Sequence, residues 1–177
     1  MVFKILLILL ALIALFLIVA AFQPSEFRIT RSGMIAAPPP VVFGQVNDLR
    51  KWEAWSPWAK LDPAMKQTYD GPAVGVGAVS TWVGNKQVGE GKMTIMESRP
   101  FDLIRIQLDF YKPMAATNES EFHFVPEGAD QTKVNWSMTG RRNFMMKAFG
   151  LVMNMDKMVG GQFEEGLNHL NVAVKQP

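Results

Sequence analysis

The sequence predicts an α+β fold: a curved antiparallel sheet wrapped around a long C-terminal helix, plus one N-terminal transmembrane helix. Three observations give this prediction. Residues 5–22 form an uncharged apolar run, apolar and polar residues alternate between 102 and 140, and apolar residues recur at helical spacing over 149–174. These patterns are typical of a membrane span, half-buried strands and an amphipathic helix, respectively.

The apolar run follows Lys4 and ends at Gln23, and its length is what a helix needs to cross the hydrocarbon core of a bilayer. A secretory signal has a shorter apolar region and a small-residue cleavage site, for which Val19-Ala20-Ala21 is a candidate. We therefore expect residues 1–23 to be an uncleaved anchor, with a removed signal as the alternative. Residues 24–177 are expected to form one domain.

The charges around the span give opposing indications of its orientation. Lys4 and the amino terminus favour a cytoplasmic N-terminus, whereas Arg28 and Arg31 favour the reverse. Because long domains are translocated largely regardless of charge, we expect a single-pass membrane protein with its domain on the extracytoplasmic (periplasmic) side.

Composition removes several classes of function. The 177 residues carry a net charge of +2 and no cysteine, so neither a nucleic-acid partner nor a thiolate site is expected. His123 and His169 have no third ligand at useful spacing, so we expect no metal site. We also expect no cofactor, and the oligomeric state is left open.

The domain begins with an expected strand over 27–35 and two short helices. Proline suits the first turn of a helix, which places the first helix over 39–46. Asp48 is expected to cap the second helix, which runs over 48–55 and is stopped by Pro57.

From residue 65 onward, short segments with a period of two predict the rest of the sheet. A short strand is expected over 65–70, followed by a hairpin that turns at Asn85-Lys86. Three strands with one apolar face then follow, over 102–111, 116–125 and 131–140. In chain order this gives a strand, two short helices, five or six antiparallel strands and the long helix.

The C-terminal helix needs an apolar partner, and the inner face of the sheet provides one. Gly160-Gly161 weakens the middle of this helix, so we expect a bend or break there or near Asn154–Asp156. A single helix covers only part of a concave sheet. The remaining space is expected to be a cavity for a small ligand.

Five stretches together resemble one known superfamily. They are VNDLRKWEAWSPWAKLDP (46–63), VGVGAVSTWVG (74–84), VGEGKMTIMESRP (88–100), TKVNWSMTG (132–140) and GGQFEEGLNHL (160–170). The chain is similar over about residues 27–174 to the SRPBCC superfamily, also called START-like or helix-grip proteins, and within it to the bacterial polyketide cyclase/dehydrase type. The resemblance implies the helix-grip fold and an internal pocket for a hydrophobic small molecule. It implies no particular reaction, because fold does not fix function.

The stretch WEAWSPW, residues 52–58, holds three of the five tryptophans. The rings could form a cap that plugs one end of the barrel, line the pocket, or lie at the lipid interface. Methionine side chains adapt to varied apolar partners and could line the pocket. The alternative for each methionine is an ordinary place in the hydrophobic core. The expected pocket residues are Trp55, Trp58, Trp82, Met93, Phe110, Phe122, Trp136, Met138, Phe149 and Met153.

Two carboxylates are candidates for an interior acid or base. Asp156 lies midway between Val152 and Val159 on the apolar stripe, where burial would raise its pKa. The alternative is that Asp156 caps a helix that starts there. Glu97, on the same expected strand face as Met93, is the second candidate.

Three functions remain open at this point. The first is a membrane-anchored domain that binds a hydrophobic small molecule, lipid-like or polyketide- or isoprenoid-like, without catalysis. The second is a cyclase/dehydratase-type enzyme that uses an interior carboxylate. The third is a protein-interaction module tethered to the membrane. The expected partners are accordingly a hydrophobic small molecule or lipid and the membrane itself.

Overall fold

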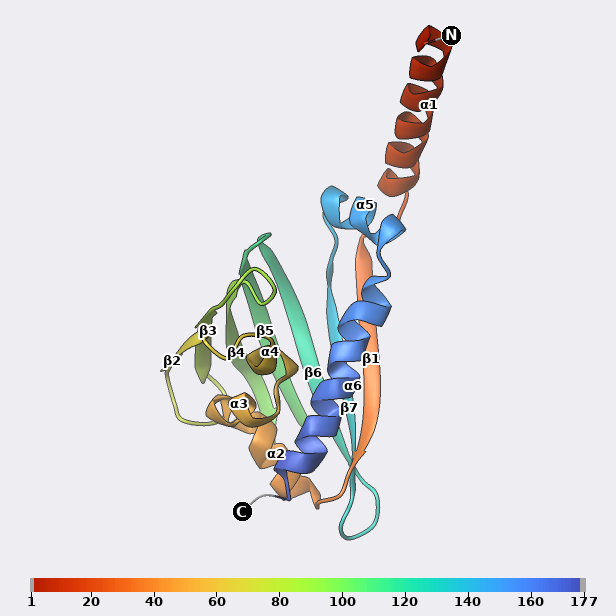
Figure 1. Cartoon of the computed structure of the whole chain (residues 1–177). Helices are drawn as coiled ribbons and strands as arrows, with labels where there is room; N and C mark the ends of the chain where they lie inside the picture. Colours follow the sequence, from red (N-terminus) through yellow and green to blue (C-terminus); the bar gives the residue numbers. More distant parts are fainter. Residues whose placement is uncertain (1, 176–177) are drawn as a thin grey trace.

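The computed structural model describes residues 2–175, and the predicted domain limits at residues 1 and 177 lie outside this range. Helix α1 (Val2–Ala21) projects from one end of the domain, here called the α1 end, and α2 (Pro39–Asn47) lies at the opposite α2 end (Figure 1). Among the described residues, α1 is the one helix long and apolar enough to cross a membrane. A signal sequence would meet the same criteria.

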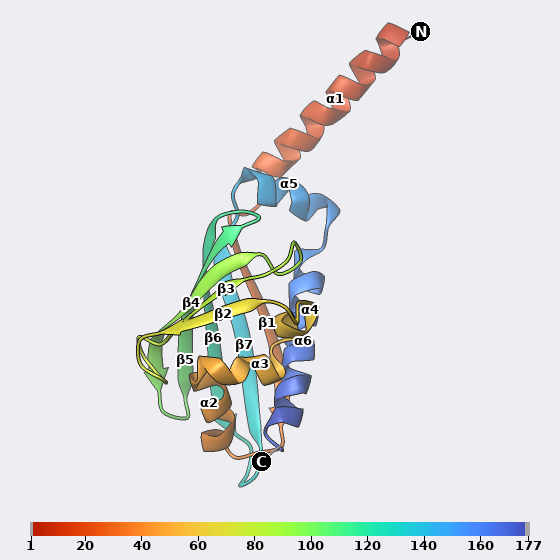
Figure 2. The same cartoon turned by 60° about the vertical axis from the view of Figure 1, so that its left-hand side comes forward.

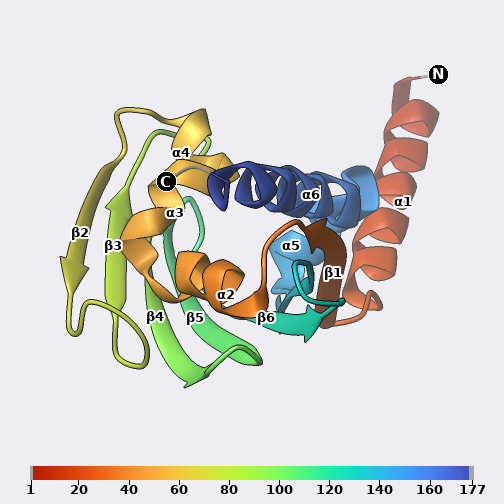
Figure 3. The same cartoon turned by 90° about the horizontal axis from the view of Figure 1, so that it is seen from below.

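A single seven-stranded antiparallel sheet, ordered β1-β7-β6-β5-β4-β3-β2, forms the body of the domain. Its strands are β1 (Glu26–Ile35), β2 (Lys66–Asp70), β3 (Val79–Val83), β4 (Glu90–Arg99), β5 (Leu103–Lys112), β6 (Ala116–Pro126) and β7 (Thr132–Arg141). The sheet curves around helix α6 (Met155–Ala173), as the view from below shows (Figure 3). The predicted helix-grip architecture is confirmed.

Short helical pieces cover the α2 end of the concave face. They are α2, the 3-10 turn η1 (Leu49–Lys51), α3 (Trp52–Trp55) and α4 (Pro57–Leu61). Asp48 caps η1 by accepting from the backbone N–H of Arg50. The prediction that Pro57 stops the second helix is confirmed, because α3 ends at Trp55. A further short helix that was not predicted follows it. Pro57 occupies the first turn of α4, where a proline costs no hydrogen bond.

The C-terminal helix is broken at the second of the two predicted positions. Helix α5 (Phe144–Val152) ends at Met153, and Asn154 starts α6 by accepting from the backbone N–H of Lys157. Helix α6 continues without a break through Gly160 and Gly161. A Cβ on Gly160 would lie 2.1 Å from Nη2 of Arg31, so this glycine leaves the space that the guanidinium occupies.

Aromatic rings fill the half of the interior next to the α2 end. Trp55 and Phe122 have no exposed surface, and the indole of Trp52 lies 4.5 Å from that of Trp55 between ring centroids. The indole N–H of Trp136 donates to Oγ of Ser120 at 2.9 Å, so its one polar atom is satisfied. Tryptophans 52 and 55 therefore plug this end of the barrel.

Candidate functional site

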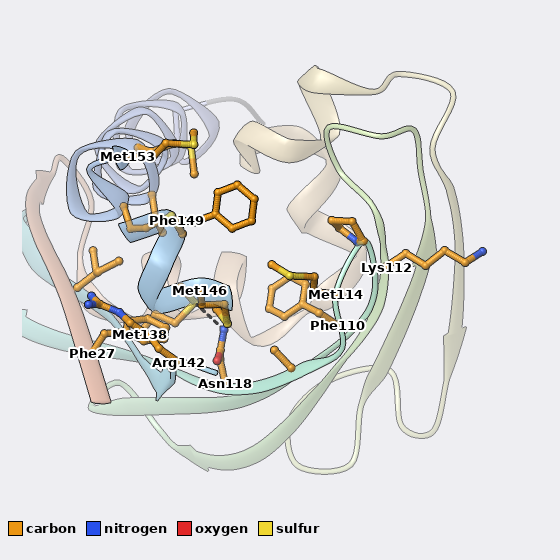
Figure 4. Close-up of a pocket in the computed structure, with 16 residues that line it drawn as sticks. Phe27, Phe110, Lys112, Met114, Asn118, Met138, Arg142, Met146, Phe149 and Met153 are labelled. Carbon is orange, nitrogen blue, oxygen red and sulfur yellow. Dashed lines mark hydrogen bonds between the residues drawn. The ribbon is translucent and has the colours of Figure 1, made fainter. Parts of the chain in front are cut away.

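The interior is hollow at the α1 end, where a cavity of about 370 Å³ lies between the sheet and the two C-terminal helices. Figure 4 shows its wall, with Phe149 projecting from α5 on one side and Phe110 and Met114 on the other. Six of the lining residues are methionines: Met114, Met138, Met146, Met153, Met155 and Met158. Flexible thioether side chains allow such a wall to adapt to apolar molecules of different shape.

The hollow arises from a taper in side-chain size along β6. Its inward residues run Phe124, Phe122, Ser120, Asn118 and Ala116 from the α2 end to the α1 end, and the first four are buried. Large rings therefore fill one half of the barrel, while small side chains leave space in the other. This taper was visible in the sequence and is the signal that an argument based on aromatic residues alone missed.

At the same level, helix α6 passes from residues that are buried in the core to residues that line the cavity. Phe163, Leu167 and Leu170 are buried against the sheet, whereas Met158 nearer the α1 end lines the cavity and is half exposed. Beyond the break at Asn154, the chain turns away from the barrel axis, and α5 crosses the α1 end (Figure 1). The cavity is therefore open, with half-exposed apolar side chains at its mouth.

Asn118 is the buried polar residue in the cavity wall. Its exposed fraction is 7%, its Nδ2 donates only to Sδ of Met138 at 3.9 Å, and its Oδ1 has no partner among the described residues. Figure 4 shows this amide on the cavity floor beside Met138. A buried amide without a good partner is costly, so a ligand that hydrogen-bonds it would be stabilised at this position.

Two basic residues mark the rim of the cavity. The guanidinium of Arg142 lies 5.5 Å above the ring of Phe27, and Nζ of Lys112 forms an ion pair with Glu90 at 2.8 Å. No Asp or Glu lines the cavity in the described part of the chain. The site is therefore apolar inside, with one amide on its floor and the guanidinium of Arg142 at its edge.

Four of the ten predicted pocket residues line this cavity: Phe110, Met138, Phe149 and Met153. The other six do not, and their predicted place in its wall is corrected. Trp55, Phe122 and Trp136 are buried in the aromatic plug. Trp58 packs its ring against Trp136 and Phe163.

Trp82 and Met93 also lie outside the wall. The indole of Trp82 is 5.7 Å from the ring of Phe110 between centroids, so Trp82 packs beside a lining residue on the same face of the sheet. A Cβ on Gly91, its partner across the strand pair, would lie 2.5 Å from this indole. Met93 is partly buried and packs against the core. Sequence reasoning missed Asn118, Met114 and Met146, which come from the tapered strand, the β5–β6 turn and α5.

Asp156 does not point into the interior, although the acid–base hypothesis for this residue requires it. It lies in the first turn of α6 with 61% of its side chain exposed, and Nη2 of Arg31 donates to its Oδ2 at 2.9 Å. Arg31 holds the pKa of Asp156 below its usual range, the opposite of what an interior acid requires. Asn154 is the cap residue, so the capping alternative was right about the helix start but not about the residue.

Glu97 is also on the outside, because β4 contains a β-bulge. Ile95 pairs with Ile106 and Glu97 with Arg105, so Met96 is the extra residue and the alternation is reversed beyond it. Glu97 therefore lies on the outer face, where it accepts a hydrogen bond from Arg105. Within residues 2–175, no cluster of three or more His, Asp or Glu could hold a metal ion.

The comparisons with known proteins agree with this fold. Residues 26–175 match the family described as "Polyketide cyclase / dehydrase and lipid transport". A search of the curated proteins gave no match.

Among solved structures, a truncated norcoclaurine synthase from Thalictrum flavum is similar with a TM-score of 0.63 and 16% identity, over 88% of this chain and 98% of the other. The Zhui aromatase/cyclase from Streptomyces sp. R1128 is similar with a TM-score of 0.62 and 13% identity, over 85% and 94%. Protein CV1439 from Chromobacterium violaceum gives 0.59 and 14%, over 87% and 100%. At these identities the likeness is one of fold.

Proposed function

Because the chain belongs to the polyketide cyclase / dehydrase and lipid transport family, we propose that its domain binds one hydrophobic small molecule in the cavity at the α1 end. The observation that carries this proposal is an open apolar cavity with one buried, unsatisfied amide on its floor. Ligand sites combine this kind of apolar wall with a few fixed polar groups, and the volume of about 370 Å³ is in their usual range.

The ligand class follows from the wall. Met and Phe side chains favour a flexible apolar body, such as an acyl, polyketide or isoprenoid chain. Asn118 would hydrogen-bond a hydroxyl or carbonyl on the part of the ligand that reaches the floor. Arg142 at the rim is placed to favour a ligand with an anionic or strongly polar end left at the mouth.

The proposal includes residues 1–23 as an uncleaved anchor and 24–177 as the binding domain on the extracytoplasmic side. Helix α1 supports it: the helix has 20 residues, which corresponds to a length of about 30 Å, and only Ala20 is buried against the rest of the molecule. A helix this apolar that packs against almost nothing in its own chain is suited to a lipid environment.

A cyclase or dehydratase reaction is the alternative that the family description keeps open. It would need a group that moves protons in the cavity wall. Among the described lining residues, the ionisable side chains are Lys112 and Arg142, and both are at the rim. Both carboxylate candidates are outside, so the geometry supports binding more directly than catalysis.

The test compares two neighbouring substitutions in the full-length protein, purified in a mild detergent. Ala116→Phe adds a ring at a lining position, whereas Ala115→Phe adds the same ring to an adjacent exposed residue outside the wall. Native mass spectrometry is expected to find an apolar molecule bound to the wild type and to Ala115→Phe, but not to Ala116→Phe. A wild-type chain that is empty as purified, and that binds no member of a panel of lipids and isoprenoids, would contradict the proposal.

A further inference from the structure

Exposed apolar side chains gather around the mouth of the cavity. We call this set the rim patch: Phe22, Met114, Phe144, Met145, Leu151 and Val152. The exposed fractions reach 76% for Val152 and 85% for Phe22, although both residues are apolar. A cluster of this kind on a small domain marks a surface that contacts another apolar phase.

The rim patch lies beside the end of α1. Helix α5 packs against α1, and Nζ of Lys147 donates to the backbone oxygen of Ala21 at 3.4 Å. Figures 1 and 2 show α5 lying across the base of α1, between that helix and the sheet. Only residues 22–25 separate α1 from β1, so even a fully extended link spans about 17 Å.

The charge carried by α5 and by the segment just before it is positive. Arg141, Arg142 and Lys147 lie on or just before α5, and the stretch from 131 to 155 contains no Asp or Glu. Basic side chains next to an apolar helix face are the pattern of a segment at the surface of a membrane with anionic lipids.

We propose that the rim patch docks on the same bilayer that α1 spans, so that the cavity mouth opens into the boundary between lipid headgroups and acyl chains. The inference rests on the proposed function and adds the source of the ligand: an amphiphile passes from the membrane into the cavity without crossing water. Phe149, Met153 and Met158, all half exposed at the mouth, then face acyl chains instead of solvent.

The bilayer is favoured over a second copy or a protein partner by the continuity between α5 and α1. A surface fixed against the end of a spanning helix by the Lys147–Ala21 contact is held at the headgroup level whenever α1 is inserted. Its basic residues then complement anionic headgroups.

The experiment uses the full chain, which has no native cysteine and therefore accepts single spin labels without background. Labels are placed at Val152→Cys on α5 and Met114→Cys in the β5–β6 turn. The control is Val125→Cys, an exposed apolar residue at the α2 end of β6. The protein is inserted in nanodiscs of phosphatidylethanolamine and phosphatidylglycerol. Accessibility to oxygen and to a water-soluble nickel chelate is then measured by electron paramagnetic resonance.

Docking predicts that the labels at 152 and 114 are accessible to oxygen and shielded from nickel, while the label at 125 shows the reverse. Replacing phosphatidylglycerol by phosphatidylcholine is expected to reduce the shielding at 152. If all three labels have the accessibility of the control, the inference is overturned. Dipolar coupling between labels at 152, with shielding from both reagents, would indicate a second copy instead and would also overturn it.

Ligand retention in detergent separates this inference from the proposed function. Shielded labels on a chain that binds no apolar molecule would contradict the ligand proposal but leave the docking surface in place. Exposed labels on a chain that retains its ligand would contradict the docking surface alone.

Discussion

The indole of Trp136 lies face to face with the ring of Phe163, with 4.1 Å between ring centroids and 7° between ring planes. The ring of Phe122 also stacks on this indole, with 4.7 Å between ring centroids. These rings separate a solid half of the barrel from the cavity, whose wall begins one inward residue further along β7, at Met138.

The first prediction compares two phenylalanines on opposite sides of that boundary. Phe163 is 1% exposed and Phe149 is 50% exposed. Phe163→Ala is expected to lower the free energy of unfolding by about 3–5 kcal/mol, because it opens a void in a packed core. Phe149→Ala should change stability little but weaken binding of an apolar ligand. Denaturation followed by tryptophan fluorescence, together with ligand titration, checks both; equal losses of stability would contradict the division of the interior.

The second prediction concerns the paired glycines of α6. A Cβ on Gly161 meets nothing within 4 Å, so Gly161→Ala is expected to stabilise the helix by about 1 kcal/mol. Gly160→Ala displaces the guanidinium of Arg31 and should give no net gain. In an Arg31→Ala background, the two substitutions should become equivalent. A full gain from Gly160→Ala while Arg31 is present would show that this glycine is not needed for the contact.

The third prediction concerns acid. Arg31 lowers the pKa of Asp156 in the folded chain, and the usual value in an unfolded chain is about 3.9. A depressed pKa contributes stability that is fully present above the unfolded value and is lost as pH falls through the folded one. Asp156→Asn should therefore destabilise the domain at pH 6, and the difference from wild type should shrink progressively as the pH falls below about 4.

Urea denaturation across this pH range measures that effect. The control is the Arg31→Gln background, in which Asp156→Asn should have little effect at either pH, because the partner that lowers the pKa is gone. A difference between wild type and Asp156→Asn that is constant from pH 6 to pH 3 would exclude the ion pair as its source.

The fourth prediction concerns the amide on the cavity floor. Asn118→Leu is expected to stabilise the ligand-free domain by about 1 kcal/mol, because it removes a buried, unsatisfied group. The same change should weaken a long-chain alcohol about tenfold and leave the alkane of equal length unaffected. Competition against a fluorescent fatty probe measures both. Equal weakening of the alcohol and the alkane would mean that Asn118 contributes shape and not a hydrogen bond.

Much of the fold was predictable because strand and helix periods are local properties of the sequence. The alternation around Ile104 and Ile106 correctly gave the buried face of β5, and the two possible breaks in the last helix included the right one at Asn154. The errors come from features of single residues. One extra residue at Met96 moves Glu97 to the other face of the sheet. The helix stop before Pro57 was predicted, but the short helix that begins at the same proline was not.

The location of the hollow was harder to predict because it depends on relative side-chain size across several strands. Trp55 and Trp136 suggest a ligand wall by their type, but they are large enough to fill their own half of the barrel. The cavity instead lies where Ser120, Asn118 and Ala116 follow Phe122 on one face of β6. Asp156 was misplaced for a related reason: its partner Arg31 is 125 residues away in sequence.

The stacked pair of Trp136 and Phe163 has a consequence for how such chains diversify. Residues that hold the barrel together and residues that contact a guest molecule are on opposite sides of this pair. Methionines of the wall can therefore be exchanged for other apolar residues while the chain still folds. A library randomised at Met138, Met146 and Met158 should consequently yield well-folded variants that bind different apolar ligands and keep the same packed half of the barrel.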